Sequence, residues 1–248
     1  MVHARLPHAL APLAALLLLG AAPAPFDMAA RMLPAPATPG PNVTPYVKHE
    51  AGPIALTHVR VIDGTGGWVK DARLRLENGR IAAVQSAAEA VPGQYKIIDA
   101  SGKSVMPGLV GMHDHMYYTE LPNLDATGKS ESPRVIPQMT YSSPKMYLAA
   151  GVTTLRTTGS VEPYDDLNLK REIDAGHLVG PHMDVTAPYL EGPNSPFIQM
   201  HQLKDAAEAR SFVAFWADQG ASSYKAYMNI PRAQLGAAIE EAHRRGLK

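Results

Sequence analysis

Two histidines one residue apart, His113 and His115, are the residues whose types and spacing point most directly to metal chemistry. They end an apolar run, residues 105–115. In an extended strand alternate side chains share a face, so both imidazoles point one way and Asp114 the other. Their Cα atoms would lie roughly 6.6 Å apart, at about 3.3 Å per residue, so both rings can reach one metal ion. Paired strand histidines also occur hydrogen-bonded inside a core, and their spacing alone leaves both readings open.

Composition limits the other kinds of chemistry. The 248 residues can form one large domain or two smaller ones, each with a substantial core. Lys and Arg number 23, as do Asp and Glu, and the formal net charge of zero gives no attraction to nucleic acid. There is no cysteine, which excludes disulfides, Cys-ligated zinc and a cysteine nucleophile.

Residues 1–24 predict a signal peptide for export to the periplasm or the cell exterior. Arg5 precedes an apolar run, residues 9–22, that is rich in Leu and Ala. The run is too short to span a bilayer, for which about 20 apolar residues are needed. A buried helix is the alternative, and Pro12 argues against it. We expect no membrane attachment once the signal is cleaved.

The next two segments differ in character. Residues 25–50 are rich in proline and predict a mobile or extended leader without regular structure. Residues 51–104 contain short alternating strands separated by turns, which predict a small antiparallel β-unit. Asn78 and Gly79 supply a two-residue hairpin turn, because both tolerate a positive φ.

Strand-like and helical segments alternate in the rest of the chain. The strand-like runs are residues 105–115, 152–158, 183–189 and 222–228, and the helical segments are residues 144–150, 164–175, 205–219 and 232–245. Asp205 is a typical N-cap, and Gly220 stops the same helix. Such repetition implies a parallel sheet with crossover helices. The spacing suits an open doubly wound sheet or part of a (β/α)8 barrel, which needs about 250 residues in full.

The order of these features resembles the amidohydrolase superfamily, in its imidazolonepropionase-like and prolidase-like branches. The resemblance is carried by IDASGK at residues 98–103, MPGLVGMHDH at 106–115 and GVTTLR at 151–156. It implies an α/β fold in which residues 105–248 form the first half of a TIM barrel, about four β/α units. Residues 51–104 would be the N-terminal part of a composite β-sandwich. His113 and His115 match the family's strand-one metal ligands.

The resemblance also assigns a role to Lys225. The run SSYKAYM, residues 222–228, looks like the strand that supplies a carboxylated lysine bridging two metals in hydantoinase-like and dihydroorotase-like members. An ammonium group repels divalent cations, but burial lowers a lysine's pKa, and the neutral amine can add carbon dioxide. The carbamate suits two metals about 3.5–4 Å apart. The alternative is that Lys225 extends from a strand end and binds nothing.

The implied function is hydrolysis of a carbon–nitrogen bond in a small molecule: a non-peptide amide, a cyclic amide or a dipeptide. The implied cofactor is a pair of divalent cations, with zinc expected, whose bound hydroxide attacks the carbonyl group. Two other classes stay open. One is a deaminase with a single metal, in which Lys225 is structural. The other is a truncated binding protein without catalysis.

The sequence departs from the family at its C-terminal end. Members have further histidines after strands five and six and an aspartate general base after strand eight. Strand five is expected beyond Lys248. No catalytic residue is therefore assigned, and we expect this chain to be an incomplete N-terminal fragment that is inactive alone. The oligomeric state leaves no trace in the sequence.

Other polar residues have two interpretations. Five lie near the ends of proposed barrel strands and could either line a substrate pocket or be structural. These are Tyr117, Tyr118, Arg156, Tyr189 and Glu191. The histidines expected at the surface or in turns are His58, His177, His182 and His243.

Overall fold

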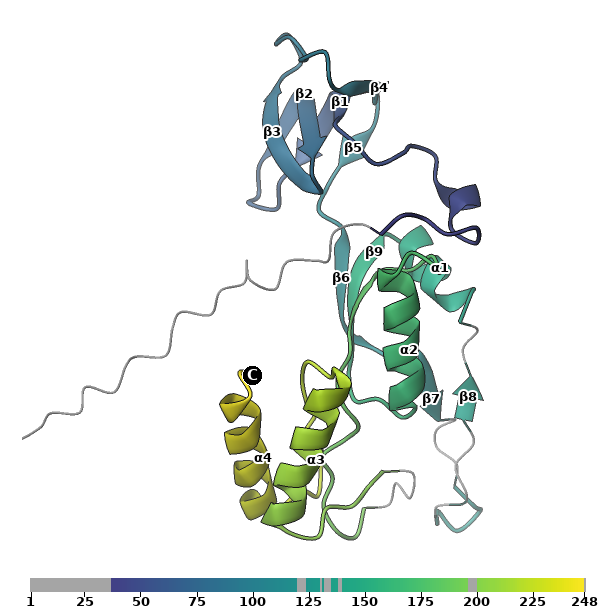
Figure 1. Ribbon diagram of the computed structural model, residues 1–248, viewed down its shortest axis with the longest axis vertical. Helices are drawn as coiled ribbons and strands as arrows, with labels where there is room; N and C mark the ends of the chain where they lie inside the picture. The colour runs from purple at the N-terminus through teal and green to yellow at the C-terminus, as the bar shows by residue number, and fades with distance from the viewer. Residues whose placement is uncertain are drawn as a thin grey trace, which may run out of the picture. The chain divides into compact units, whose positions relative to one another are not determined.

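The structure is a computed structural model, and it describes residues 37–119, 124–129, 131, 135–137, 140–195 and 200–247 (Figure 1). The predicted signal peptide, residues 1–24, lies outside the described residues. The strands are β1 (Ile54–Ile62), β2 (Trp68–Glu77), β3 (Arg80–Ser86), β4 (Lys96–Asp99), β5 (Ser104–Val105), β6 (Leu109–Asp114), β7 (Tyr117–Thr119), β8 (Val135–Pro137), β9 (Val152–Thr157) and β10 (His182–Asp184). The helices are the 3₁₀ helix η1 (Thr44–Tyr46), α1 (Ser143–Ala149), α2 (Pro163–Asp174), α3 (Ala206–Gln219) and α4 (Arg232–Arg244).

The first sheet has five strands, in the order β3-β2-β1-β4, with β5 also beside β1. Asn78 and Gly79 have φ values of 51° and 70°, which confirms the predicted hairpin turn between β2 and β3. The prediction of a wholly antiparallel unit is wrong, because β4 and β5 pair with β1 in parallel. The loops before β4 and β5 bring each strand to β1 in the same direction as β1, whereas a tight hairpin would have brought it in the opposite direction.

The second sheet is parallel, in the order β10-β9-β6. The predicted run of residues 105–115 is divided, since Val105 pairs with β1 while β6 pairs with β9. Pro107, which lacks an N–H group, and Gly108 separate the two parts. A Cβ at Gly108 would overlap the side chain of Thr153, so the chain passes close to β9 there.

The third and fourth predicted runs continue this parallel arrangement less regularly. Beyond β10 they are joined by isolated parallel bridges, Thr186 to Ser223 and Leu190 to Ala226. Continuous strands over residues 183–189 and 222–228 are therefore not formed as predicted, although both segments run side by side. Single backbone hydrogen bonds link the two segments, from the amide of Ala187 to the carbonyl of Ser223 and from the amide of Leu190 to that of Lys225.

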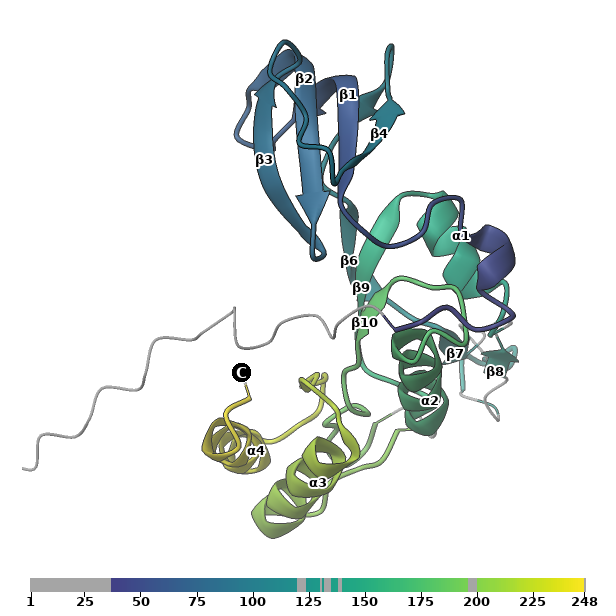
Figure 2. The ribbon, with the colours of Figure 1, turned by 45° about the horizontal axis from the view of Figure 1, so that its top comes forward.

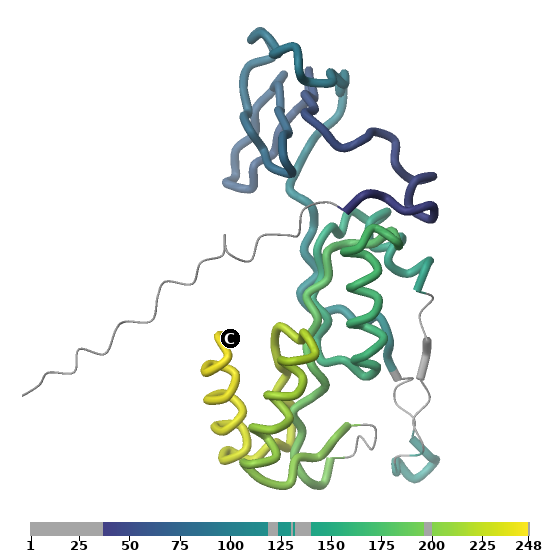
Figure 3. Tube along the Cα trace, viewed as in Figure 1, coloured from purple at the N-terminus to yellow at the C-terminus, as the bar shows by residue number. Residues whose placement is uncertain are grey.

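The four helices follow the predicted pattern, and each begins and ends within two residues of its expected bounds. α2 packs on the parallel strands (Figure 2), where Leu167 lies in one buried cluster with Leu155 and Met183. α3 and α4 lie side by side (Figure 3). No helix in the described part of the chain is long and apolar enough to cross a membrane.

The architecture is thus mixed α/β, with parallel strands connected by helices. The described residues form no closed barrel: β6 is at the edge of its sheet. Val110 and Met112 on this strand are 57% and 60% exposed. The strand that ends in the histidine pair is therefore covered by few side chains.

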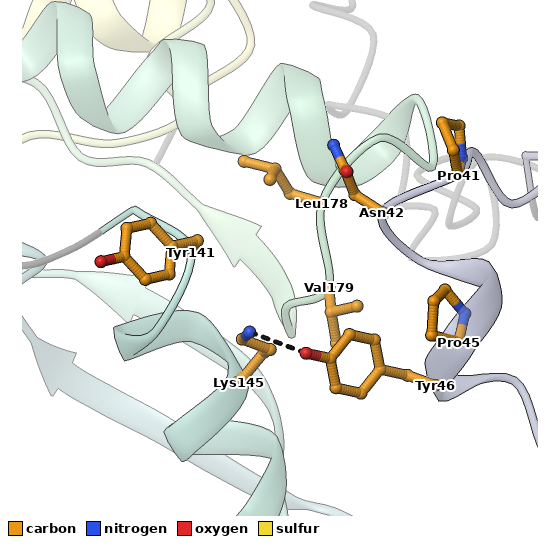
Figure 4. Close-up of a pocket in the computed structure, with 8 residues that line it drawn as sticks. All are labelled: Pro41, Asn42, Pro45, Tyr46, Tyr141, Lys145, Leu178 and Val179. Atoms are coloured by element: carbon orange, nitrogen blue, oxygen red, sulfur yellow. Dashed lines mark hydrogen bonds between the residues drawn. The ribbon is translucent and has the colours of Figure 1, made fainter.

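The proline-rich leader is more ordered than predicted over its described part. Thr44–Tyr46 form a 3₁₀ helix whose first turn holds Pro45, because proline already has a helical φ. The amide of Gly40 donates to the carbonyl of Gly176 over 2.8 Å. Tyr46 accepts a hydrogen bond from Lys145 beside a cavity of about 420 Å³ (Figure 4). The prediction of a leader without regular structure is wrong for this segment.

Asp205 caps α3 as the sequence predicts, since its carboxylate accepts the amide of Glu208 over 2.8 Å. We expect Asp205→Ala to lower the free energy of unfolding by about 1 kcal/mol, because this amide loses its partner. Asp205→Asn keeps an acceptor and should cost only a fraction of that. Urea unfolding of both variants checks the expectation, and equal losses would contradict the capping role.

Candidate metal centre

The two histidines lie next to each other at the end of β6. Their ring centroids are 5.5 Å apart, with the ring planes at 71°. His113 is exposed and His115 is partly buried. The alternation along the strand therefore brings both rings together as predicted, and their role as metal ligands stays a prediction.

Lys225 reaches the same region from the fourth strand-like segment. Its Nζ donates to the carbonyl oxygen of Thr158 over 3.3 Å. The ammonium group also lies over two aromatic rings, 4.8 Å from the centroid of Tyr189 and 5.1 Å from that of Tyr227. Lys225 is close enough to His115 for its charge to affect that imidazole. Lys225 thus lies near His113 and His115, although 110 positions in the sequence separate it from His115.

Electrostatics favours neutral forms of the groups that would bind a metal. Burial, together with the charges of Lys225 and His113, lowers the pKa of His115 to about 4. His115 is therefore neutral at pH 7 and can offer a lone pair. Burial also lowers the pKa of Lys225 from its ordinary value, which moves the amine towards the form that could take up carbon dioxide.

The turn after β9 contacts both His115 and Lys225. The backbone of Gly159 hydrogen-bonds the imidazole of His115, as a supporting group does for a metal-binding histidine. Gly159 has φ +80°, and a Cβ there would lie 2.7 Å from the ring of Tyr189. Only glycine allows the ring to approach the turn so closely.

Tyrosine rings surround the site. The ring of Tyr118 lies 4.3 Å from that of His115, and Tyr189 meets Tyr227 edge-on at 5.0 Å. Burial raises the pKa of Tyr189 far above its ordinary value, so its phenol stays neutral. Tyr117 instead lies in the buried cluster under the sheet, and burial raises its pKa to about 12. Tyr118 and Tyr189 therefore face the site, whereas Tyr117 is part of the core.

Arg156 and Glu191 have structural partners. The guanidinium of Arg156 donates to the hydroxyl of Ser223 over 3.2 Å. Glu191 is completely buried, and its carboxylate accepts the amides of Gly192 and Asn229 over 2.9 and 2.8 Å. It also accepts the hydroxyl of Ser195 over 3.2 Å. Glu191 therefore ties the loop after the third segment to the loop after Lys225.

The remaining histidines are outside this region, as predicted. Ion pairs join His58 to Asp71 over 2.8 Å and His177 to Glu172 over 3.0 Å. His243 is exposed on α4. The predicted surface position is confirmed for His58, His177 and His243. The prediction is wrong for His182, which begins strand β10 and lies 3.9 Å from Asp174 with its side chain 29% exposed.

The candidate ligands supply only part of what a divalent metal ion needs. Among the described residues, no three His, Asp or Glu side chains gather closely enough to hold an ion. Two imidazoles and one lysine amine are present, and only a carbamate on Lys225 would add the anionic oxygen atoms that divalent cations prefer.

The sequence did not indicate the residues that support His115 and Lys225 from behind. Thr158 and Gly159 supply backbone groups, which no side-chain pattern reveals. Ser160 and Asp166 lie behind them, buried to 2% exposure. The one available signal was that Asp166 falls on the same side of α2 as the apolar Leu167 and Leu169.

Comparison with known proteins finds solved structures of similar fold. A protein from Bifidobacterium longum assigned as a prolidase matches 79% of this chain and 48% of its own, with a TM-score of 0.62 and 26% identity. A Xaa-Pro dipeptidase with bound methionine matches 79% of this chain and 55% of its own, with a TM-score of 0.61 and 15% identity, which shows the fold alone. The chain thus spans about half the length of these structures.

One curated relative matches a shorter stretch. A dihydroorotase from Syntrophus aciditrophicus (strain SB) is 41% identical over 63 residues, which is 25% of this chain and 15% of the relative. No family model matches the sequence. The chain is thus similar in fold to a prolidase over about half of that protein's length, and similar in sequence to a dihydroorotase over a short stretch, both of them proteins of the amidohydrolase kind.

Proposed function

We propose that the protein is an exported metal-dependent hydrolase that cleaves a carbon–nitrogen bond in a small amide, cyclic amide or dipeptide. The observation that carries the proposal is the convergence of His113, His115 and Lys225 beside one turn. A prolidase and a dihydroorotase among the similar proteins support this bond type. The export signal that the sequence predicts in residues 1–24 supports the proposed location.

The proposal includes the arrangement of the parent fold. Residues 105–248 would be the first half of a (β/α)8 barrel, and residues 51–104 would contribute to a composite β-sandwich. The parallel order of β6, β9 and β10 supports the first assignment. In such barrels the active site lies at the carboxyl ends of the strands, which is where His115 and Gly159 are found.

The chain's own residues would prepare the site. His113 and His115 would offer lone pairs, and burial, which lowers the pKa of Lys225, favours its neutral amine. The neutral amine would add carbon dioxide to form an N–C bond and release one proton. His113, His115 and the carbamate of Lys225 would hold the divalent cations, which would supply Lewis-acid chemistry for a carbonyl group and for a water molecule.

Metal content tests the proposal. We expect the wild-type protein that carries this chain together with the remaining half of the barrel, incubated with zinc and bicarbonate and then desalted, to retain about two ions, as in two-metal sites. Lys225→Ala should retain at most one, because the bridging carbamate is lost. Lys103→Ala, which changes an exposed lysine in another part of the chain, is the matched control and should behave as wild type. A wild-type protein that retains no metal would overturn the proposal.

A deaminase with a single metal is the second candidate. The observation that favours it is that Lys225 already has partners as an ammonium group, namely Thr158 and two tyrosine rings. Bicarbonate separates the candidates, because only the carbamate site needs carbon dioxide. Retention of one ion regardless of bicarbonate and of Lys225→Ala would favour the second candidate.

A further inference from the structure

The turn after β9 is held from behind by a buried polar network. Thr158 accepts Lys225 and Gly159 contacts His115, so the position of this turn sets where both groups lie. Its next residue, Ser160, contacts Asp166 in the first turns of α2. Both side chains are only 2% exposed. None of these contacts is needed to place the histidines on β6.

The hydroxyl of Ser160 shows where the proton of this network lies. It is 2.9 Å from the carbonyl oxygen of Thr186, which can only accept, and 2.5 Å from Oδ2 of Asp166. A hydroxyl group carries one proton. If Ser160 donates it to Thr186, the proton in the short contact must come from the carboxyl group of Asp166.

Thr157 completes the same pattern. Its Oγ1 accepts the amide of Thr186 over 3.0 Å, so its own proton is available to Ser160, whose Oγ is 3.5 Å away. Ser160 then accepts twice and donates once, which uses its full hydrogen-bonding capacity. An ionised Asp166 would instead compete with the carbonyl of Thr186 for a single proton.

The surroundings of Asp166 disfavour its charge. Its second oxygen, Oδ1, is buried without a hydrogen-bond partner among the described residues. The neighbouring charges are the carboxylates of Asp165 on α2 and of Glu162 at its N-cap, and Tyr117 on β7 is near enough for the charge of Asp166 to raise the pKa of its phenol. Burial, aided by the two carboxylates, raises the pKa of Asp166 to about 7 against the opposing effect of Ser160.

We propose that Asp166 is a positioning residue that acts as a neutral carboxylic acid, donating the hydrogen bond that locks the turn carrying Thr158 and Gly159. Through this turn it positions the partners of Lys225 and His115. The importance of these two residues rests on the proposed function. The neutral acid itself does not, because it follows from the contacts of Ser160.

The proposal gives a direction for pH dependence. The folded chain holds a proton that the unfolded chain, with an aspartate pKa of 3.8, has released. Stability from this group is therefore present at low pH and is lost as the pH rises through about 7. The turn should loosen over the same range, since the carboxylate can no longer donate to Ser160.

Asp166→Asn tests this, because an amide NH₂ donates as the neutral acid does and does not ionise. Between pH 5 and pH 8 the unfolding equilibrium constant of the wild type should rise by about 10²-fold relative to that of Asp166→Asn. The exposed neighbour Asp165→Asn is the matched control and should keep most of the wild-type pH dependence, because burial is the main cause of the raised pKa of Asp166. A constant ratio between wild type and Asp166→Asn would overturn the proposal.

Two further measurements use the metal-free chain, so they fail or succeed independently of the metal-content test. Infrared spectra of the wild type at pH 5 should show a protonated carboxylic acid band that Asp166→Asn lacks. The backbone amide resonances of Gly159 and Ser160 should shift between pH 5 and pH 8 in the wild type and in Asp165→Asn only. An absent band, or the same shift in Asp166→Asn, would show that Asp166 is ionised or does not hold the turn.

Discussion

Gly159→Ala should lower the free energy of unfolding by about 3 kcal/mol. The φ of +80° costs a residue with a Cβ roughly 1–2 kcal/mol. The new methyl group would also lie 2.7 Å from the ring of Tyr189, and such overpacking typically costs about 1–3 kcal/mol. Chemical denaturation gives the value directly.

Gly64→Ala is the matched control for this variant. Its φ of +84° is nearly the same, but nothing lies within 4 Å of the position of a Cβ. It should therefore cost only the backbone part, about 1–2 kcal/mol. Equal losses for both variants would show that Tyr189 is not packed tightly against the turn. A displaced Tyr189 should also expose the amine of Lys225 and raise its reactivity towards acylating reagents.

Glu191→Ala should cost about 3 kcal/mol or more. The substitution removes the carboxylate that accepts the amide of the buried Gly192, the amide of Asn229 and one hydrogen bond of the buried Ser195. Each unsatisfied buried donor costs about 1–3 kcal/mol. The loops after the third and fourth segments should separate, which thermal unfolding and proteolysis near Asn229 would both detect.

Glu191→Gln distinguishes the hydrogen bonds from the volume of the side chain. Its carbonyl oxygen can accept both amides and its NH₂ group can donate to Ser195, so most of the stability should return. Glu240→Ala removes a carboxylate that is 68% exposed and paired with Arg210, and should change stability by less than about 1 kcal/mol. Losses of the same size in Glu191→Ala and Glu240→Ala would contradict the tie between the loops.

Local rules explain what could be predicted from the sequence. The period of a strand places His113 beside His115, and helix capping places the ends of α3 at Asp205 and Gly220. Gly220 has φ +104°, as a glycine after a helix often does. These features depend on neighbouring residues along the chain, so a single sequence contains them.

Features that depend on distant contacts were not predictable. The direction of β4 beside β1 depends on how loops return, and a residue pattern does not record that path. The neutral state of Asp166 depends on Ser160 and on the carbonyl of Thr186, which belongs to another strand-like segment. Lys225 shows both limits: its position was predicted from a family resemblance, but its cage of Tyr189 and Tyr227 was not.

In the part of the chain that the structure describes, no strand pairs with the outer edge of β6, and this has a consequence for the behaviour of the chain in solution. An uncovered edge strand presents free amide and carbonyl groups that can pair with a strand of another molecule. Val110 and Met112 add apolar surface at this edge, and a formal net charge of zero provides no mutual repulsion at neutral pH. Concentrated samples will therefore tend to self-associate through β6, and conditions that give the chain a net charge will keep it dispersed.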